Sequence, residues 1–470
     1  MTEGFDEDPN EPGDATADLV LNSTEVATIL YQEGDHARVT SFWTEQLDGS
    51  DRQYAGQDRP QYNLTATDVN NLWITGYADA IGDLKVVKEK AESANNSLLL
   101  GIAQTIEALN FGTTTALHGD VPYREVGQGN ENLNPQFDPQ LEIYDEGIIQ
   151  ALDAAVGNLE QGGISPGERD AFYGGDQAAW IEAANSIKAR YMLHVAHVDE
   201  EPVAQYTFQD VYDAAQEGIS EPANDLIAPH QEALNVNANI FWQFRNDRGD
   251  DLTANGSYAA RLLDENTQFY RGNDKTEETG RFDTYFFGDD PDYDMAGNAS
   301  TNNESGFFYS RSADYPIVTY VENELIKAEA AVQSSELTLQ DAVDALNNAR
   351  NANEARFDDT TYDDYVLGDF ASGGIANPNG NDTQAEALLR EILEEKYLAL
   401  ISNIEAYADL RRTENFLGVQ DSDGDVLTMD DLPQRFPIAQ SEVTGNENVP
   451  DPIPSIQSVT PANETAYPLP

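Results

Sequence analysis

The chain has 470 residues, of which 40% are hydrophobic, so it is long enough and apolar enough to fold around a substantial core. It carries 86 acidic and 25 basic residues, a formal net charge of −61, which makes nucleic acid and anionic membranes poor partners. Cysteine is absent, which excludes disulfides and thiol chemistry.

Apolar residues recur at three- and four-residue steps along most of the chain, and this spacing predicts a mainly helical protein. Residues 1–18 are acidic and turn-rich, and we expect them to be extended. The least regular part is 200–315, where we expect one short helix at 211–218. The other predicted helices cover 19–31, 38–48, 71–94, about 96–118, 138–159, 176–195, 316–333, 338–351 and 385–411.

Several predicted helices have recognisable ends. The apolar pattern after Asn96 stops at Gly119 and Pro122, because neither residue favours continuation of a helix. Asp138 followed by Pro139 predicts a helix start, with aspartate as the cap and proline in the first turn. Asp176 is the predicted cap of the next helix.

The acidic residues are spread along the whole chain instead of forming one patch. A local patch would indicate a basic partner, whereas a uniformly acidic surface is typical of adaptation to high salt, where cations screen the repulsion. Only seven of the basic residues are lysine, which also favours adaptation to high salt. No stretch approaches the roughly 18 apolar residues of a membrane span, and the first residues do not form a signal peptide.

Motifs in a fixed order along the chain resemble those of the SusD/RagB family of outer-membrane nutrient-binding lipoproteins. A long apolar helix runs into the turn GDVPY at 119–123. Glu182 and Ile438 depart from the family pattern, which has lysine and tyrosine at these positions. The other matching segments are 41–54 (SFWTEQLDGSDRQY), 176–190 (DQAAWIEAANSIKAR), 281–286 (RFDTYF), 321–350 (VENELIKAEAA…AVDALNNAR), 391–413 (EILEEKYLALISNIEAYADLRRT) and 433–446 (PQRFPIAQSEVTGN).

This resemblance implies an all-α fold, in which helix pairs like those of tetratricopeptide (TPR) repeats form an α-α superhelix with long irregular loops. After a tether over 1–18, a single domain would span 19–470. Its helical scaffold would cover about 19–200 and 316–415, its loop-rich ligand region about 200–315, and its tail about 416–470.

The resemblance also implies non-catalytic binding of a nutrient, most often a glycan or oligosaccharide, at the cell surface of a Bacteroidetes-type bacterium. The charge balance adds the expectation that this bacterium is halophilic. The ligand would pass to a SusC-type TonB-dependent transporter in the outer membrane. The only membrane attachment would be an N-terminal lipid anchor on the extracellular face. Family members carry a Pro-Asn pair after a lipid-bearing cysteine. Here Pro9-Asn10 is present, and by the resemblance we expect Met1 to stand where that cysteine was, with the signal peptide removed.

Six residues are candidates for ligand binding. Aromatic rings flanked by polar groups bind the apolar faces and hydroxyl edges of sugars. Each aromatic side chain could instead pack in the core, as we expect for Trp180 within its apolar stripe. The candidates are Trp43, Arg52, Tyr54, Asn71, Trp73 and Trp242.

Sites for catalysis or metal binding are less well supported. Residues 163–167 read G-x-S-x-G, but Pro166 lacks the N–H that an oxyanion hole needs, so we expect a loop. His194 and His197 could ligate a metal from one helix, although packed or solvated histidines are more common. We expect no cofactor.

An acidic turn near the C-terminus is the remaining cation candidate. Asp421, Asp423 and Asp425 resemble the start of a calcium loop, yet Val426 and Leu432 stand where the EF-hand requires glycine and glutamate. The turn is therefore either an acidic turn or a site for weakly bound calcium or another cation.

Three alternative functions remain open from the sequence. The ligand could be a peptide instead of a glycan. The chain could be a helical-repeat scaffold that binds only another protein. It could also be a surface hydrolase, although paired catalytic carboxylates cannot be identified among so many acidic residues.

Overall fold

The computed structural model describes residues 15–128, 132–233, 236–297 and 306–470. Helices dominate these residues and the strands are short, which confirms the predicted all-α class. Most of the predicted tether, including Pro9 and Asn10, lies outside the described residues. No helix in the described ranges is long and apolar enough to cross a membrane.

The helices alternate with short connections in the first half of the chain. They are α1 (Ala17–Glu33), α2 (Asp35–Trp43), α3 (Arg52–Gln57), α4 (Asn70–Leu72), the π-helical η1 (Trp73–Asp79), α5 (Ala80–Ser93), α6 (Ser97–His118), α7 (Gln140–Glu142), the π-helical η3 (Ile143–Ile149), α8 (Gln150–Gln161), η4 (Gly167–Arg169), α9 (Gln177–Val195), η5 (Val203–Gln205) and α10 (Phe208–Gln216).

The second half contains longer loops. Its helices are η6 (Pro222–Asn224), α11 (Ile240–Arg248), η7 (Gly249–Asp251), α12 (Tyr258–Leu263), α13 (Thr279–Tyr285), α14 (Tyr320–Gln333), α15 (Leu339–Arg356), η9 (Leu367–Phe370), α16 (Gln384–Ala399), α17 (Glu405–Arg412), α18 (Gln440–Gly445) and η10 (Pro461–Asn463).

The strands form two-stranded antiparallel ladders that fasten loops to one another. The pairs are β1 (Val121–Pro122) with β2 (Phe137–Asp138), β3 (Leu226–Ala228) with β7 (Tyr315–Val318), β4 (Thr276–Glu277) with β8 (Thr361–Tyr362), and β5 (Phe286–Phe287) with β6 (Asp294–Met295).

Helix α6 runs through the centre of the scaffold and is buried along most of its length. The side chain of Asn96 caps its first turn by accepting a hydrogen bond from the backbone N–H of Leu99. The helix ends where Gly119 adopts a φ of 80°, a conformation that glycine reaches without strain. Both predicted ends of this helix are confirmed.

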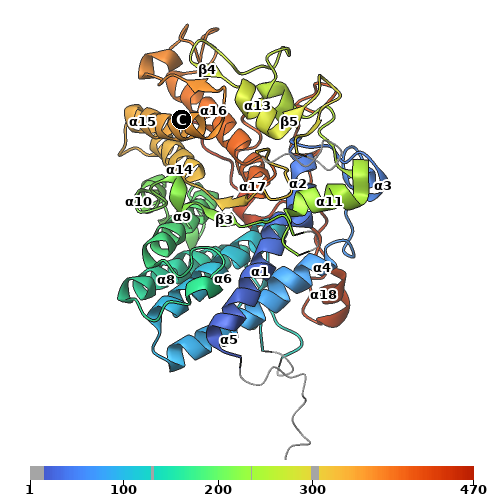
Figure 1. Ribbon diagram of the computed structural model, residues 1–470, viewed down its shortest axis with the longest axis vertical. Helices are drawn as coiled ribbons and strands as arrows, with labels where there is room; N and C mark the ends of the chain where they lie inside the picture. The colour runs from blue at the N-terminus through green and yellow to red at the C-terminus, as the bar shows by residue number, and fades with distance from the viewer. Residues whose placement is uncertain (1–14, 129–131, 234–235, 298–305) are drawn as a thin grey trace, which may run out of the picture.

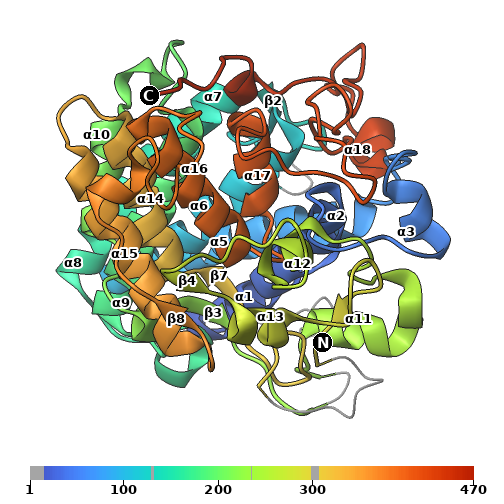
Figure 2. The ribbon, with the colours of Figure 1, turned by 90° about the horizontal axis from the view of Figure 1, so that it is seen from above.

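The helices pack as successive pairs around two apolar clusters. Helices α14 and α15 form one pair, and α9 with α10 forms another. Figure 2 shows α8, α9, α14 and α15 on one side of the molecule and α3, α11 and α18 on the other. We call the side that carries α8, α9, α14 and α15 the scaffold side.

The predicted helix over 385–411 is wrong, because it is two helices, α16 and α17. Gln46 explains the break: its side-chain amide donates to the backbone carbonyls of Tyr397 and Leu400 at 2.9 and 3.3 Å, and its oxygen accepts from the N–H of Ser402 at 3.0 Å. Ser402 itself has a φ of 63°. A residue distant in sequence therefore satisfies the helix end.

Other parts of the prediction also differ from the structure. Residues 316–318 belong to strand β7, because their backbone pairs with β3. Helix α2 begins at Asp35 and ends at Trp43, before the positive φ of Glu45. The region 200–315 contains α11, α12 and α13 besides the expected short helix, because these helices are too short to show a clear apolar period.

Candidate functional site

The first part of the chain meets the middle part at the face that carries α3 and α11. We call this surface, formed by residues 51–71 and 240–251, the loop face. The ring of Tyr54 on α3 stacks on that of Phe244 on α11, with centroids 5.1 Å apart. Arg52 forms an ion pair with Asp251 at 3.1 Å. Two segments about 190 residues apart in sequence thereby form one surface.

The four aromatic candidates on and beneath this face are buried. The exposed fractions are 0% for Trp43, 1% for Tyr54, 2% for Trp73 and 5% for Trp242. A ring that stacks on a sugar must present one face to solvent. These four rings therefore pack in the core in this conformation, and Trp180 at 0% does so as expected.

A chain of rings connects two of these tryptophans under the loop face. Trp43 contacts Phe436, with centroids 4.9 Å apart, and Phe436 contacts His36 at 5.1 Å. His36 lies 5.9 Å from His118, which lies 5.1 Å from Trp73. Burial lowers the pKa of His36 to about 3 and holds the pKa of His118 well below its usual value, so both histidines are uncharged at neutral pH.

Polar side chains are what the loop face presents to solvent. Asn71 is exposed, and the side chain of Arg52 is 57% exposed. A hollow of about 40 Å³ opens beside Tyr54 and His36. Because ligand pockets typically measure about 300–1,000 Å³, this hollow is too small for a sugar ring.

Two of the residues considered for catalysis or metal binding, Ser165 and His194, have other partners. Ser165 lies in the loop after α8, preceded by a helix and not by a strand. His194 lies 3.0 Å from the hydroxyl of Tyr144 and 2.8 Å from the carboxylate of Glu405. Its two ring nitrogens are therefore used within the core.

The acidic turn is also held by internal contacts. One carboxylate oxygen of Asp421 accepts from the N–H groups of Asp423 and Asp425 at 3.0 and 2.9 Å, and the other pairs with Arg59 at 2.8 Å. Asp421 thus stabilises the turn itself. Within the described residues, no group of three or more His, Asp or Glu side chains is arranged to hold a metal ion.

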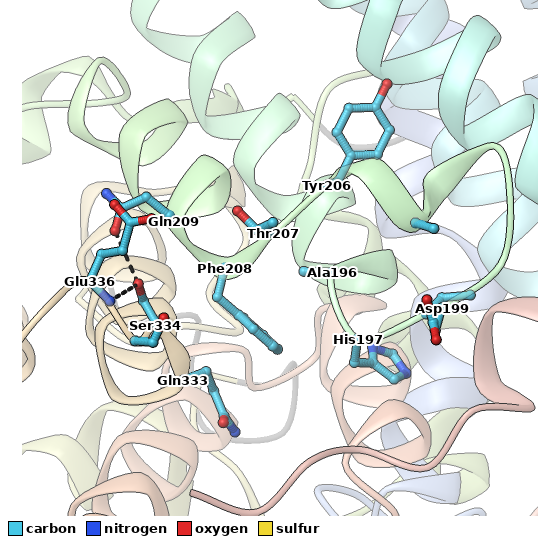
Figure 3. A pocket seen from close by; sticks show the side chains of 13 residues that line it. Ala196, His197, Asp199, Tyr206, Thr207, Phe208, Gln209, Gln333, Ser334 and Glu336 are labelled. Atoms are coloured by element: carbon cyan, nitrogen blue, oxygen red, sulfur yellow. Dashed lines mark hydrogen bonds between the residues drawn. The ribbon is translucent and has the colours of Figure 1, made fainter.

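Two larger hollows lie on the scaffold side and share Tyr206. One, of about 320 Å³, lies between the end of α9, the start of α10 and the end of α14. The other, of about 420 Å³, lies between α8, α9 and α10. We call the two hollows together the Tyr206 cleft; Figure 3 shows the first of them. Sequence reasoning missed the cleft because the first hollow is formed by segments more than 100 residues apart and the second by side chains of three separate helices.

The comparisons with known proteins follow this geometry. Residues 9–437 match the SusD-like family model described as "Starch-binding associating with outer membrane". The chain belongs to the SusD-like family. The predicted resemblance is therefore confirmed over nearly the whole chain. No curated protein matches this sequence.

Solved structures of several SusD-like proteins share the fold. A SusD/RagB family protein from Bacteroides thetaiotaomicron is 20% identical, with a TM-score of 0.69 over 97% of this chain and 100% of that one. A SusD homologue from Parabacteroides distasonis is 15% identical, with a TM-score of 0.69 over 96% and 99%. A chitin-binding protein is 17% identical, with a TM-score of 0.66 over 96% and 100%. At these identities the likeness establishes the SusD-like fold.

Proposed function

We propose that this SusD-like protein binds an oligosaccharide at the cell surface and delivers it, chemically unchanged, to a SusC-type TonB-dependent transporter. The match of residues 9–437 to a family described by starch binding and outer-membrane association carries this proposal. The chitin-binding protein of the same fold supports a glycan over a peptide as the ligand. A lipid anchor before the described residues would hold the protein on the extracellular face.

We place the proposed ligand contacts on the loop face, at Arg52 and Asn71, which are exposed, whereas the ring of Tyr54 packs beneath them. Trp43, Trp73 and Trp242 act in this proposal as the rigid base beneath the face, because their rings are buried. A face with polar groups but no ring-sized hollow fits a site that is completed when a second protein covers it. The transporter is the proposed second protein.

A binding screen tests the proposal. Purified protein in molar salt is titrated with neutral oligosaccharides and with peptides, alone and with the co-expressed transporter, and binding is read by tryptophan fluorescence and calorimetry. We expect saturable glycan binding that weakens in the Arg52→Ala and Asn71→Ala variants. Arg169→Ala, at an exposed arginine of η4 outside the loop face, is the matched control.

Three outcomes would contradict the proposal. Binding of the transporter without any saccharide would favour a protein-interaction scaffold, and saturable binding of peptides alone would favour a peptide carrier. New reducing ends after incubation with polysaccharides would instead identify a surface hydrolase.

A further inference from the structure

We propose that the Tyr206 cleft is a second saccharide-binding site, separate from the loop face and selective for uncharged or cationic sugars. Figure 2 shows α10 and α14, which border the cleft, on the opposite side of the molecule from α3 and α11. The choice of a saccharide over other neutral ligands rests on the proposed function. The position and charge preference of the site rest on the cleft itself.

The aromatic side chains of the cleft are presented differently from the buried tryptophans. Tyr206 and Phe208 are half-buried, and each therefore keeps part of its ring accessible. Figure 3 shows the two rings pointing in opposite directions from the segment that enters α10. Half-exposed rings beside polar groups are the arrangement that binds the C–H face of a sugar.

Tyr206 is held rigidly in its position. Its hydroxyl donates a hydrogen bond of 2.5 Å to the carboxylate of Asp145 on η3, and the amide of Gln205 donates to the same oxygen at 3.2 Å. Thr207 and Asp210 form a capping box that fixes the start of α10 immediately after it. A ring that is fixed before binding loses little conformational entropy when a ligand stacks on it.

Polar groups at the rim are also ordered in advance. Ser334 donates to the side-chain oxygen of Gln209 at 3.0 Å and accepts from the backbone N–H of Glu336 at 3.1 Å (Figure 3). The amide of Gln209 donates to Asp213 at 2.9 Å. This network joins α10 to the end of α14 and leaves carboxylate oxygens at the rim as acceptors for sugar hydroxyl groups.

The charge of the cleft determines which ligands it accepts. Six carboxylates border the two hollows, and the only cation among their lining residues, Lys188, is paired with Asp153 at 2.9 Å. An anionic ligand would meet repulsion on every side, which disfavours uronic acids, sulfated sugars and the carboxylate ends of peptides. The six are Asp153, Asp199, Asp210, Asp213, Glu217 and Glu336.

The volumes are consistent with short oligosaccharides. About 320 and 420 Å³ fall at the lower end of the range for small-molecule pockets. Tyr206 lines both hollows. A ligand that stacks on this ring therefore occupies one hollow and can extend into the other.

Hydrogen exchange of the full chain with and without ligand locates the site directly. The probes are malto-, cello-, xylo-, manno- and chito-hexaose, with oligogalacturonate as the anionic probe, in molar salt. We expect at least one neutral hexaose to slow exchange over residues 203–217, and oligogalacturonate to have no effect there. This readout uses the unmodified protein and does not depend on the folding of a variant.

Calorimetry with variants tests the role of the ring. Tyr206→Ala should weaken binding about tenfold or more because it removes the stacking surface, whereas Tyr206→Phe should weaken it less than about threefold because the ring remains. Tyr320→Ala, at a half-buried tyrosine outside the two hollows, should leave affinity unchanged.

The outcomes separate this inference from the proposed function. Binding that Arg52→Ala weakens, with no protection at 203–217 and no effect of Tyr206→Ala, would overturn the cleft and leave the loop face standing. The reverse pattern would support the cleft and remove the ligand from the loop face. If no hexaose binds at a concentration of about 10 mM, which is far above ordinary dissociation constants, both proposals fail.

Discussion

Arg412 on α17 forms a bidentate ion pair with Glu329 on α14, with nitrogen–oxygen distances of 2.5 and 2.7 Å. Both side chains are almost completely buried. Tyr467 donates a further hydrogen bond to Glu329 at 2.7 Å, and this contact ties the C-terminal tail to the helical scaffold. Burial alone would raise the pKa of the Glu329 carboxyl group, but the positive charges of Arg412 and Lys396 lower it.

Removing one partner of this pair should destabilise the protein strongly. Arg412→Met leaves the Glu329 carboxylate buried without its main partner, and we expect a loss of about 3–5 kcal/mol in the free energy of unfolding. Asp153→Asn, which breaks an exposed pair with Lys188, should cost no more than about 1 kcal/mol. Chemical denaturation measures both. If the double variant Glu329→Gln/Arg412→Met is no more stable than Arg412→Met, the unpaired-charge explanation is wrong.

Two glycines, Gly76 in η1 and Gly82 in α5, which follows η1 directly, should respond oppositely to alanine. A Cβ on Gly76 would lie 2.0 Å from the ring of Tyr31 on α1, so Gly76→Ala must push α1 away and should cost about 3 kcal/mol or more. A Cβ on Gly82 meets nothing within 4 Å, and Gly82→Ala should stabilise the helix by about 0.5–1 kcal/mol. Thermal unfolding of the two variants tests this; equal melting temperatures would contradict the close packing of α1.

Asp225 should make stability fall as pH rises. Burial raises the pKa of Asp225 to about 7, against a value near 4 in the unfolded chain. The group therefore stabilises the fold at low pH, and this contribution is lost as pH rises through about 7. Asp225→Asn keeps an oxygen that can accept from the N–H of Tyr320, so relative to wild type it should gain on the order of 1 kcal/mol between about pH 5 and about pH 9.

Asp341 provides a control of the opposite sign. Hydrogen bonds from the side chain and backbone of Thr338 lower the pKa of Asp341. Its stabilising contribution is thus present at neutral pH and lost as pH falls below about 4. Asp341→Asn should destabilise the protein at neutral pH and have no effect in acid. The same slope for both variants would refute the linkage argument.

The tryptophans beneath the loop face should behave as core residues. Trp73→Ala and Trp43→Ala should each cost about 3–5 kcal/mol, because a large buried side chain is removed. Trp73→Phe, which retains an aromatic ring next to His118, should cost clearly less. Native stability in Trp73→Ala, together with lost glycan binding, would show that Trp73 is a ligand platform in solution.

Salt should raise the stability of the protein, because it screens the repulsion between carboxylates. With a net charge of −61, repulsion between carboxylates acts over about 10 Å at 0.1 M salt and about 3 Å at 1 M. We therefore expect a higher melting temperature in molar sodium chloride than in dilute buffer, with sucrose at equal osmolarity as the control. A melting temperature that does not change with salt would refute adaptation to high salt.

Local pattern was sufficient to predict much of the scaffold. The apolar stripe of α6, its end at Gly119 and the cap of α9 at Asp176 depend on neighbouring residues, and the structure confirms all three. Where a distant residue decides, the pattern was wrong. Gln46 divides the predicted helix over 385–411 near Leu400. Pairing with β3 places residues 316–318, which were predicted to be helical, in strand β7.

The candidate site shows the same division. The motifs indicated the family, because the family's motifs occur in this chain in the same order. They could not show whether Trp73 and Trp242 face solvent, because exposure depends on what packs against a ring: His118 and Tyr77 cover Trp73, and Arg311 lies over Trp242. The Tyr206 cleft could not be predicted from the sequence either, because separate elements form its walls.

Composition and periodicity by themselves determined that this protein is acidic and helical, since these properties depend on residue type and short-range spacing. The ordered motifs added the resemblance to the SusD-like family. Only the tertiary structure decided which aromatic rings are buried and where hollows large enough for a sugar lie. Burial and cavities are properties of surfaces brought together from distant segments, and their free energies depend on solvent that is excluded only when the chain has folded.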